Sequence, residues 1–218
     1  MTSDLYIYLF CVLVITLIVN LIINKYYNIK KIKLILFTII SPIIGVITTC
    51  IMSYIESGSF RGTSFFGAIF LMPIYVLIVS VILKVKSSKL INLTAFLGMI
   101  TSVVLKLRCM KYHCCGGRKI NIFVEDEGYL TFPSQLVEMI FAFIIFIILI
   151  ILFLKNKDRK DLYPIMMTIY GAGRFILNSY RLVTPVLGNM AWGHIWSIVS
   201  VVIGIVWLFI LYKKEKIL

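Results

Sequence analysis

An arginine lies deep inside the apolar stretch Leu162-Tyr-Pro-Ile-Met-Met-Thr-Ile-Tyr-Gly-Ala-Gly-Arg174-Phe-Ile-Leu-Asn-Ser-Tyr-Arg181. If this stretch is one helix, a rise of about 1.5 Å per residue puts Arg174 about 18 Å from Leu162, near the middle of a bilayer. A guanidinium at that depth costs at least about 3 kcal/mol unless it faces a wet or paired site. Tyr170, Arg174, Asn178 and Arg181 follow one another at intervals of 4, 4 and 3, so they share one helix face. The pattern predicts that this polar face of the helix lines a functional site. The alternative is a structural arginine, which bonds to neighbouring carbonyls or extends its side chain to the membrane surface.

The composition around this stretch is that of a membrane protein. Of the 218 residues 61% are hydrophobic and the mean hydropathy is +1.03, which excludes an ordinary soluble domain. Apolar stretches of spanning length predict seven helices, at 5–23, 34–55, 65–83, 90–107, 134–154, 162–181 and 194–212. Asp4 stands where a signal peptide would carry basic residues, so we expect no cleavage after the first span. We expect one all-α polytopic membrane domain over residues 1–218.

The net charge of +13 has an explanation in membrane topology, because most of the basic residues lie in a few short segments between predicted spans or at the end of the last one. Fourteen of the 22 basic residues lie in four short clusters, at 25–33, 84–89, 155–160 and 213–216. With seven spans these clusters fall on one side, and the excess of basic residues in cytoplasmic loops predicts an outside N-terminus and a cytoplasmic C-terminus. The charge therefore requires no nucleic-acid partner. Motifs of serine hydrolases, zinc proteases, P-loop enzymes and dinucleotide-binding enzymes do not occur in the sequence.

A second group of basic residues lies on the predicted outer side, where loops normally carry few. It consists of Lys106, Arg108, Lys111, Arg118 and Lys119. An anionic phospholipid headgroup is the natural partner for such a group, and the alternative is an exposed loop balanced by the acidic residues 125–127. Ser102, Lys106, Cys109 and His113 recur at intervals of 4, 3 and 4, so they share a face if the fourth helix continues outward. Two polar stripes that each contain a cation predict a cavity for an anion.

Three cysteines, Cys109, Cys114 and Cys115, surround His113 in this outer segment. A zinc site would need four ligands and usually a Cys-x-x-Cys pair, which this spacing does not supply. A disulfide between Cys109 and either of the other two is compatible with an oxidising side of the membrane. A thiolate activated by the basic residues and a purely structural turn are the remaining alternatives. The following pair Gly116-Gly117 would end the helix and let backbone N–H groups approach a ligand.

Two further polar segments begin predicted spans. Phe132-Pro-Ser-Gln135-Leu-Val-Glu138 reads as a helix start in which Gln135 and Glu138 share a face, with a capping role or a role in the site. Gly193-His-Ile-Trp-Ser197 begins the last span, and His194 is either an interfacial residue at a helix start or a group that orients a headgroup.

Five blocks of the sequence resemble the prolipoprotein diacylglyceryl transferases of bacterial inner membranes, in the order of that family. They are Gly62-Thr-Ser-Phe-Phe-Gly67, Lys106 to Arg118, Pro133-Ser-Gln-Leu-Val-Glu138, Tyr170-Gly-Ala-Gly-Arg174 through Arg181, and Gly193-His-Ile-Trp-Ser197, within residues 58–218. The resemblance implies transfer of diacylglyceryl from phosphatidylglycerol to the thiol of a lipobox cysteine, with release of glycerol phosphate. It implies as partners phosphatidylglycerol or another anionic phospholipid and prolipoprotein signal peptides, and as location the bacterial cytoplasmic membrane. It implies no metal and no cofactor.

The resemblance also implies roles for individual residues. Arg174 and Lys106 would be the catalytic cations at the headgroup phosphate. The substrate-binding residues would be Tyr170, Asn178, Arg181, Arg118, Gly117, Cys109, His113, Gln135 and Glu138.

Some positions depart from the family pattern. Phe66 stands where many members have histidine, Lys106 where the family has arginine, and Cys114 near an expected acid. Asn178 replaces a glutamate, which removes the expected counter-charge of Arg174 and, with Phe66, two candidate bases. The alternatives to a lipoprotein transferase are therefore a diverged paralogue that modifies another acceptor and a non-catalytic lipid-binding membrane protein.

Overall fold

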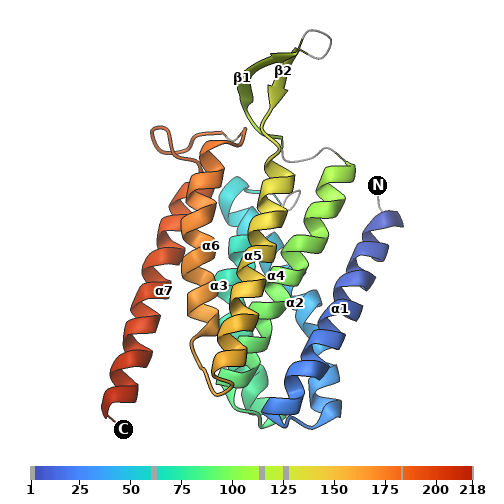
Figure 1. Cartoon of the computed structure of the whole chain (residues 1–218), viewed down its shortest axis with the longest axis vertical. Coiled ribbons are helices and arrows are strands. Elements are labelled where there is room, and N and C mark those ends of the chain that lie inside the picture. The colour runs from blue at the N-terminus through green and yellow to red at the C-terminus, as the bar shows by residue number, and fades with distance from the viewer. Residues whose placement is uncertain (1–2, 60–62, 113–115, 125–127, 183, 218) are drawn as a thin grey trace.

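The computed structural model is a bundle of helices with a β-hairpin at one end (Figure 1). It describes residues 3–59, 63–112, 116–124, 128–182 and 184–217. Within these ranges the elements are α1 (Ser3–Tyr27), α2 (Lys31–Ser57), α3 (Phe65–Leu83), α4 (Ser87–Lys111), β1 (Lys119–Val124), β2 (Gly128–Thr131), α5 (Ser134–Lys155), α6 (Leu162–Ser179) and α7 (Trp192–Ile217). Each of the seven predicted spans corresponds to one helix, so the predicted all-α membrane fold is confirmed.

Six of the seven described helices are long and apolar enough to cross a membrane, and α6 is the exception. α6 is short and carries the polar stripe that includes Arg174, which lowers its hydropathy. Arg174 lies five residues before the last residue of α6, Ser179, and so on the hairpin side of the middle of its helix. α4 is the most buried of the spanning helices, and it contacts α1, α3, α5 and α6.

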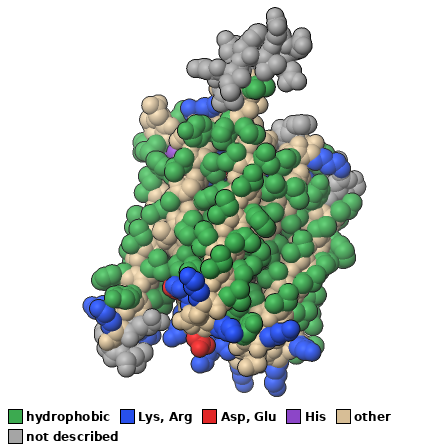
Figure 2. All heavy atoms as spheres, viewed as in Figure 1, with side chains coloured by type: hydrophobic (Ala, Val, Ile, Leu, Met, Phe, Trp, Pro, Cys, Tyr) green, Lys and Arg blue, Asp and Glu red, His purple; other side chains and the backbone are tan. Residues whose placement is uncertain are grey.

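Hydrophobic side chains cover the face of the bundle that Figure 2 shows, and this is a surface that lipid would contact. The four basic clusters all lie at helix ends opposite the hairpin. Their grouping is compatible with the predicted topology, whose orientation in the membrane stays a prediction.

Some of these basic residues also cap the C-terminal ends of neighbouring helices. The Nζ atom of Lys33 donates to the carbonyl of Leu83, the last residue of α3, at 2.5 Å. The Nζ atom of Lys89 donates to the carbonyl of Tyr27, the last residue of α1, also at 2.5 Å. Carbonyls in the last turn of a helix have no partner within it and carry the negative end of its dipole, so a cation satisfies both needs.

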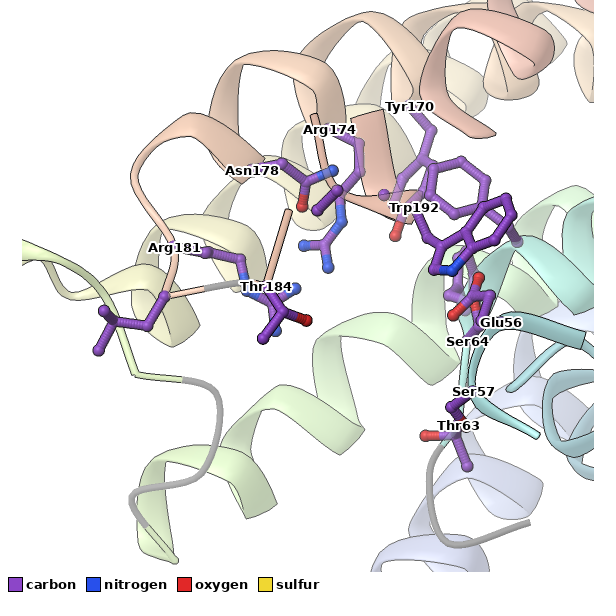
Figure 3. Close-up of a pocket in the computed structure, with 15 residues that line it drawn as sticks. Glu56, Ser57, Thr63, Ser64, Tyr170, Arg174, Asn178, Arg181, Thr184 and Trp192 are labelled. Carbon is purple, nitrogen blue, oxygen red and sulfur yellow. The ribbon is translucent and has the colours of Figure 1, made fainter. Parts of the chain in front are cut away.

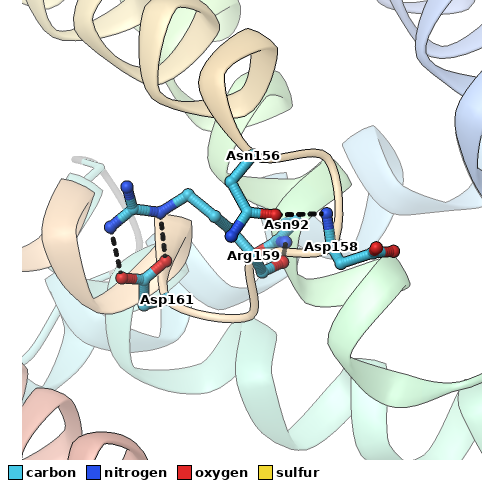
Figure 4. Close-up of polar contacts among 5 residues, drawn as sticks. All are labelled: Asn92, Asn156, Asp158, Arg159 and Asp161. Atoms are coloured by element: carbon cyan, nitrogen blue, oxygen red, sulfur yellow. Dashed lines mark hydrogen bonds and ion pairs between the residues drawn. The ribbon is translucent and has the colours of Figure 1, made fainter.

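The loop between α5 and α6 is fastened to α4 at the same end (Figure 4). Asn92, fully buried in α4, donates through Nδ2 to the carbonyl of Arg159 at 2.6 Å and to the Tyr27 hydroxyl at 3.1 Å. The Arg159 guanidinium binds both carboxylate oxygens of Asp161, at 2.8 and 2.6 Å, directly before α6 begins. Because α6 starts at this anchored loop, the anchor also sets the position of Arg174 along the bundle axis.

Small residues allow α6 and α7 to pack closely. A Cβ atom added at Gly171 would lie 2.9 Å from the Ser197 carbonyl oxygen, and one at Gly204 would lie 2.3 Å from Thr168 Oγ1. Glycine at such crossings lets two membrane helices approach to backbone contact. The polar stripe of α6 faces α5 and a cavity that residues of α2, α3 and the start of α7 also line.

The hairpin formed by β1 and β2 is antiparallel and was not predicted from the sequence. The chain that leads into it is tied to the segment that follows α6. The N–H of Arg118 donates to the Tyr180 carbonyl at 2.9 Å, and Gly117 pairs with Arg181 in an isolated bridge. A Cβ atom at Gly117 would lie 2.0 Å from the Phe132 carbonyl oxygen, so only glycine permits this approach. α4 ends at Lys111, ahead of both glycines.

Candidate functional site

A buried carboxylate joins three cations at the hairpin end of the bundle. Glu138, in the second turn of α5, forms ion pairs with Lys106 from α4 and with Arg174 from α6. Its Oε1 atom also lies 3.4 Å from the guanidinium of Arg181, just after α6. The side chain of Glu138 is 4% exposed, and the three cations are 14–16% exposed. We refer to these four residues as the Glu138 cluster.

The charges of the Glu138 cluster do not balance. Three cations face one carboxylate, which leaves a formal excess of two positive charges in a region from which water is largely excluded. Burying ions is costly unless opposite charges or hydrogen bonds compensate them. The cluster therefore favours the binding of an additional anion.

A cavity of about 490 Å³ lies beside the cluster, within the size range of small-molecule sites (Figure 3). The residues that line it are Glu56, Ser57, Thr63, Ser64, Phe65, Phe66, Tyr170, Arg174, Asn178, Arg181, Leu182, Thr184, Ala191, Trp192 and Gly193. Arg174 and Arg181 reach into it from the α6 side, and Glu56 and Ser64 lie on the opposite side. The cavity therefore has a cationic wall and an acidic wall.

Glu56 is the functional candidate that sequence reasoning missed. The Ser64 hydroxyl donates to its Oε1 atom at 2.6 Å, and the positive charge of Arg174 acts on it electrostatically. Glu56 follows the predicted span 34–55 directly, where a polar residue at a helix end is ordinary. No helical spacing connects it with the other site residues, because Ser64 and Arg174 belong to separate segments.

The polar stripe of α6 faces the cavity. Tyr170 and Asn178 are 6% and 2% exposed, and both line the cavity with Arg174 and Arg181. We expected that asparagine at position 178 leaves Arg174 without a counter-charge. That expectation was wrong, because Glu138 of a different helix pairs with Arg174. A Cβ atom at Gly193 would lie 2.5 Å from Asn178 Nδ2, so the small side chain at 178 packs directly on the start of α7.

Aromatic rings form the part of the wall where the family pattern has a histidine. Phe65 and Phe66 pack on Tyr170, with ring centroids 5.0 and 5.9 Å apart. Below them Phe70 contacts Phe66 at 6.0 Å and Trp196 at 5.9 Å. Phe70 and Trp196 in turn line an apolar cavity of about 400 Å³, with Met52, Ile69, Pro73, Met167, Val199, Ile203 and Trp207. The two cavities share no lining residue, and the contact of Phe66 with Phe70 puts aromatic rings between them. A polar cavity near an apolar one suits a ligand with a charged head and a hydrocarbon tail.

Several predicted site residues lie outside the lining of the polar cavity. Lys106 contacts Glu138, and Cys109 and Gln135 are half-buried on α4 and α5. Arg118 is exposed, and its Nε atom donates to the Arg181 carbonyl at 3.1 Å, so it supports the chain next to the cluster. Gly117 lies in the same backbone contact.

Two histidines were singled out in the sequence. His113 lies outside the described residues, with Cys114 and Cys115, so the disulfide, zinc and thiolate alternatives stay predictions. His194 is buried near the start of α7, where its Nδ1 atom accepts the N–H of Ala191 at 3.2 Å. That contact gives His194 a structural role at the beginning of the helix.

Comparison with known proteins identifies the family. The sequence matches the prolipoprotein diacylglyceryl transferase family over residues 3–210. It is 30% identical over 96 residues to a phosphatidylglycerol–prolipoprotein diacylglyceryl transferase of Clostridium botulinum strain Hall, covering 44% of this chain and 37% of the relative. For the proteins of the same name, identity is 34% over 91 residues in Clostridioides difficile strain 630 (41% and 36% covered) and 33% over 98 residues in Proteus mirabilis strain HI4320 (43% and 33% covered). The aligned part thus spans about a third of these relatives' length.

Proposed function

We propose that this chain catalyses diacylglyceryl transfer, because it belongs to the prolipoprotein diacylglyceryl transferase family. In the proposed reaction the diacylglyceryl group passes from phosphatidylglycerol to the thiol of a lipobox cysteine in a prolipoprotein, and glycerol phosphate leaves. The relatives named above carry phosphatidylglycerol and prolipoprotein in their names, which supports both substrates. We place the reaction in the cytoplasmic membrane of a bacterium, since the chain is a multi-pass membrane protein with bacterial relatives.

The observation that carries this proposal is the excess positive charge of the Glu138 cluster beside the cavity. A phosphodiester brings one negative charge, and the excess positive charge of the cluster attracts it at side chains that are only 14–16% exposed. Arg174 and Arg181 are suited to phosphate because a guanidinium offers two parallel N–H donors to two oxygens. The neighbouring apolar cavity provides room for part of an acyl chain.

The same arrangement suits the chemical step. A thiolate attacks a glyceryl carbon, and negative charge develops on the phosphate oxygen that leaves. Donors that are already in place where charge develops lower the barrier most, and the removal of one such donor typically costs about 10²–10³ in rate. Glu138 is the positioning residue in this scheme, because it holds the side chains of Lys106, Arg174 and Arg181 in one place before the phosphate binds. Lys106 acts through Glu138. Its ammonium group adds positive charge to the cluster but lacks the two parallel N–H donors with which an arginine binds two phosphate oxygens.

The proposal is tested by complementation of a bacterium depleted of its own transferase. The wild-type chain should restore thioether-linked lipoproteins, and Arg174→Ala should not. Lys31→Ala is the matched control, because Lys31 is exposed at the opposite end of the bundle and its loss also removes one positive charge. A purified wild-type chain that binds phosphatidylglycerol but yields no product with any lipobox peptide would refute the transferase activity and favour a lipid-binding protein.

A further inference from the structure

The proposed reaction needs a group that removes the proton of the acceptor thiol. A thiol with a pKa of about 8.5 is only a few per cent ionised at pH 7, so a base near the attacking sulfur accelerates the reaction. The two positions at which the family pattern carries a candidate base hold Phe66 and Asn178 in this chain, and neither side chain accepts a proton at neutral pH. Glu138 is committed elsewhere, because each of its oxygens faces a cation.

Glu56 remains as the carboxylate at the cavity. It lies across the cavity from the arginines and is half-buried in the last turn of α2. The Ser64 hydroxyl lies 2.6 Å from its Oε1 atom, and the indole of Trp196 also interacts with the carboxylate, so neutral hydrogen-bond donors orient Glu56. None of the ion pairs of the Glu138 cluster includes Glu56. Glu56 lies on the wall opposite Arg174 (Figure 3). A substrate in the cavity would therefore have a proton acceptor on one side and the phosphate-binding cations on the other.

We infer that Glu56 is the base of this site, oriented by Ser64, and this inference rests on the proposed transferase function. The S–H bond of the acceptor cysteine breaks and its proton passes to the Glu56 carboxylate. The sulfur electron pair forms the bond to the glyceryl carbon, and the bond between that carbon and the phosphate oxygen breaks with its electrons on the oxygen. Glycerol phosphate leaves with two negative charges, and the proton then passes from Glu56 to the departing phosphate or to water.

The inference is tested with the purified full-length chain in phosphatidylglycerol-containing nanodiscs and a lipobox peptide, by measuring the release of glycerol phosphate. Glu56→Gln keeps the size of the side chain and removes its basicity, so the rate at neutral pH should fall by about 10²–10⁴-fold. Binding of phosphatidylglycerol should be kept or strengthened, because the substitution removes a negative charge from the wall that faces the phosphate. Ser64→Ala should give a smaller loss, because the carboxylate remains but is no longer oriented. Ser57→Ala is the matched control, since Ser57 lines the same cavity and its hydroxyl donates to the Ser53 carbonyl instead.

Two further measurements separate a base from a merely structural residue. Raising the pH from about 7 to about 9 takes the thiol through its pKa of about 8.5, so the defect of Glu56→Gln should shrink over that range. A peptide with selenocysteine in place of cysteine is already ionised at neutral pH, and it should abolish most of the defect. A defect of constant size at every pH and with both peptides, or full activity of Glu56→Gln, would overturn the inference while the proposed function stands. A wild-type chain without activity would overturn both.

Discussion

Replacement of Glu138 by glutamine tests the central electrostatic feature of the fold. The substitution keeps the shape of the side chain and removes the charge that faces Lys106, Arg174 and Arg181. The three cations then repel one another in a region of low water content. Breaking a buried ion pair from one side typically costs about 3–5 kcal/mol, because the remaining charge stays buried. The cations keep 14–16% exposure and adjoin a cavity, so we expect the lower end of that range.

The free energy of unfolding is measured in mixed detergent micelles, with the fluorescence of the three tryptophans as the signal. Glu56→Gln is the control, because it also removes a carboxylate that lines the cavity. This carboxylate has the Ser64 hydroxyl as a partner at 2.6 Å and forms no ion pair among the described residues. The amide oxygen of glutamine can still accept from the Ser64 hydroxyl, so this change weakens one hydrogen bond and should cost no more than about 0.5–1.5 kcal/mol. An anion that replaces the missing charge should rescue Glu138→Gln. At a concentration of about a hundred times its Kd, a phosphate monoester or short-chain phosphatidylglycerol adds about 2.7 kcal/mol to a protein that binds it only when folded.

Equal stability of Glu138→Gln and Glu56→Gln would refute this reasoning. It would show that water or side-chain rearrangement neutralises the cations without Glu138. The absence of any rescue by an anion, despite the expected loss of stability, would contradict the assignment of the cluster to anion binding.

Three smaller perturbations test how the bundle holds the site in place. Asn92→Ala should lower the free energy of unfolding by about 1–3 kcal/mol, because the Arg159 carbonyl and the Tyr27 hydroxyl lose a buried donor. The control Asn156→Ala, in the exposed loop, should lower it less, and thermal unfolding measures both. Gly171→Ala should cost about 1–3 kcal/mol by forcing α6 and α7 apart, and a stability unchanged from wild type would contradict the close packing. Its control Gly45→Ala, which meets no atom within 4 Å, should gain up to about 1 kcal/mol from helix propensity. Lys33→Met should lose about 1 kcal/mol relative to Lys31→Met, because Lys33 binds the carbonyl of Leu83 at the end of α3.

The helices were predictable because each is an uninterrupted apolar stretch long enough to span a bilayer. Their ends were less predictable. α4 runs to Lys111 instead of 107, since its charged last turn has no hydropathy signal. The hairpin was missed because β1 and β2 have only six and four residues, too few for alternation of apolar and polar residues to stand out.

For the site, the sequence indicated which face of α6 is polar but not which residues meet it. Spacing along one helix gives side chains that share a face, so Tyr170, Arg174 and Asn178 could be grouped from their positions alone. The pairing of Arg174 with Glu138 depends on how α5 packs against α6, which periodicity does not encode. The same holds for Glu56, whose relation to the cavity exists only after α2 and α3 come together around Ser64.

The charges of the cavity remain balanced through the proposed reaction. Before the transfer, the Glu138 cluster carries an excess of two positive charges, and these are matched by ionised Glu56 and the single negative charge of the phosphodiester. After the transfer, Glu56 has taken the thiol proton and is neutral, while the departing glycerol phosphate carries two negative charges, since a phosphate monoester has its second pKa near about 6. Each charge that develops on the phosphate is therefore accompanied by the loss of one on the opposite wall. A site of this kind stabilises the transition state more than the bound substrate, which is the condition for catalysis.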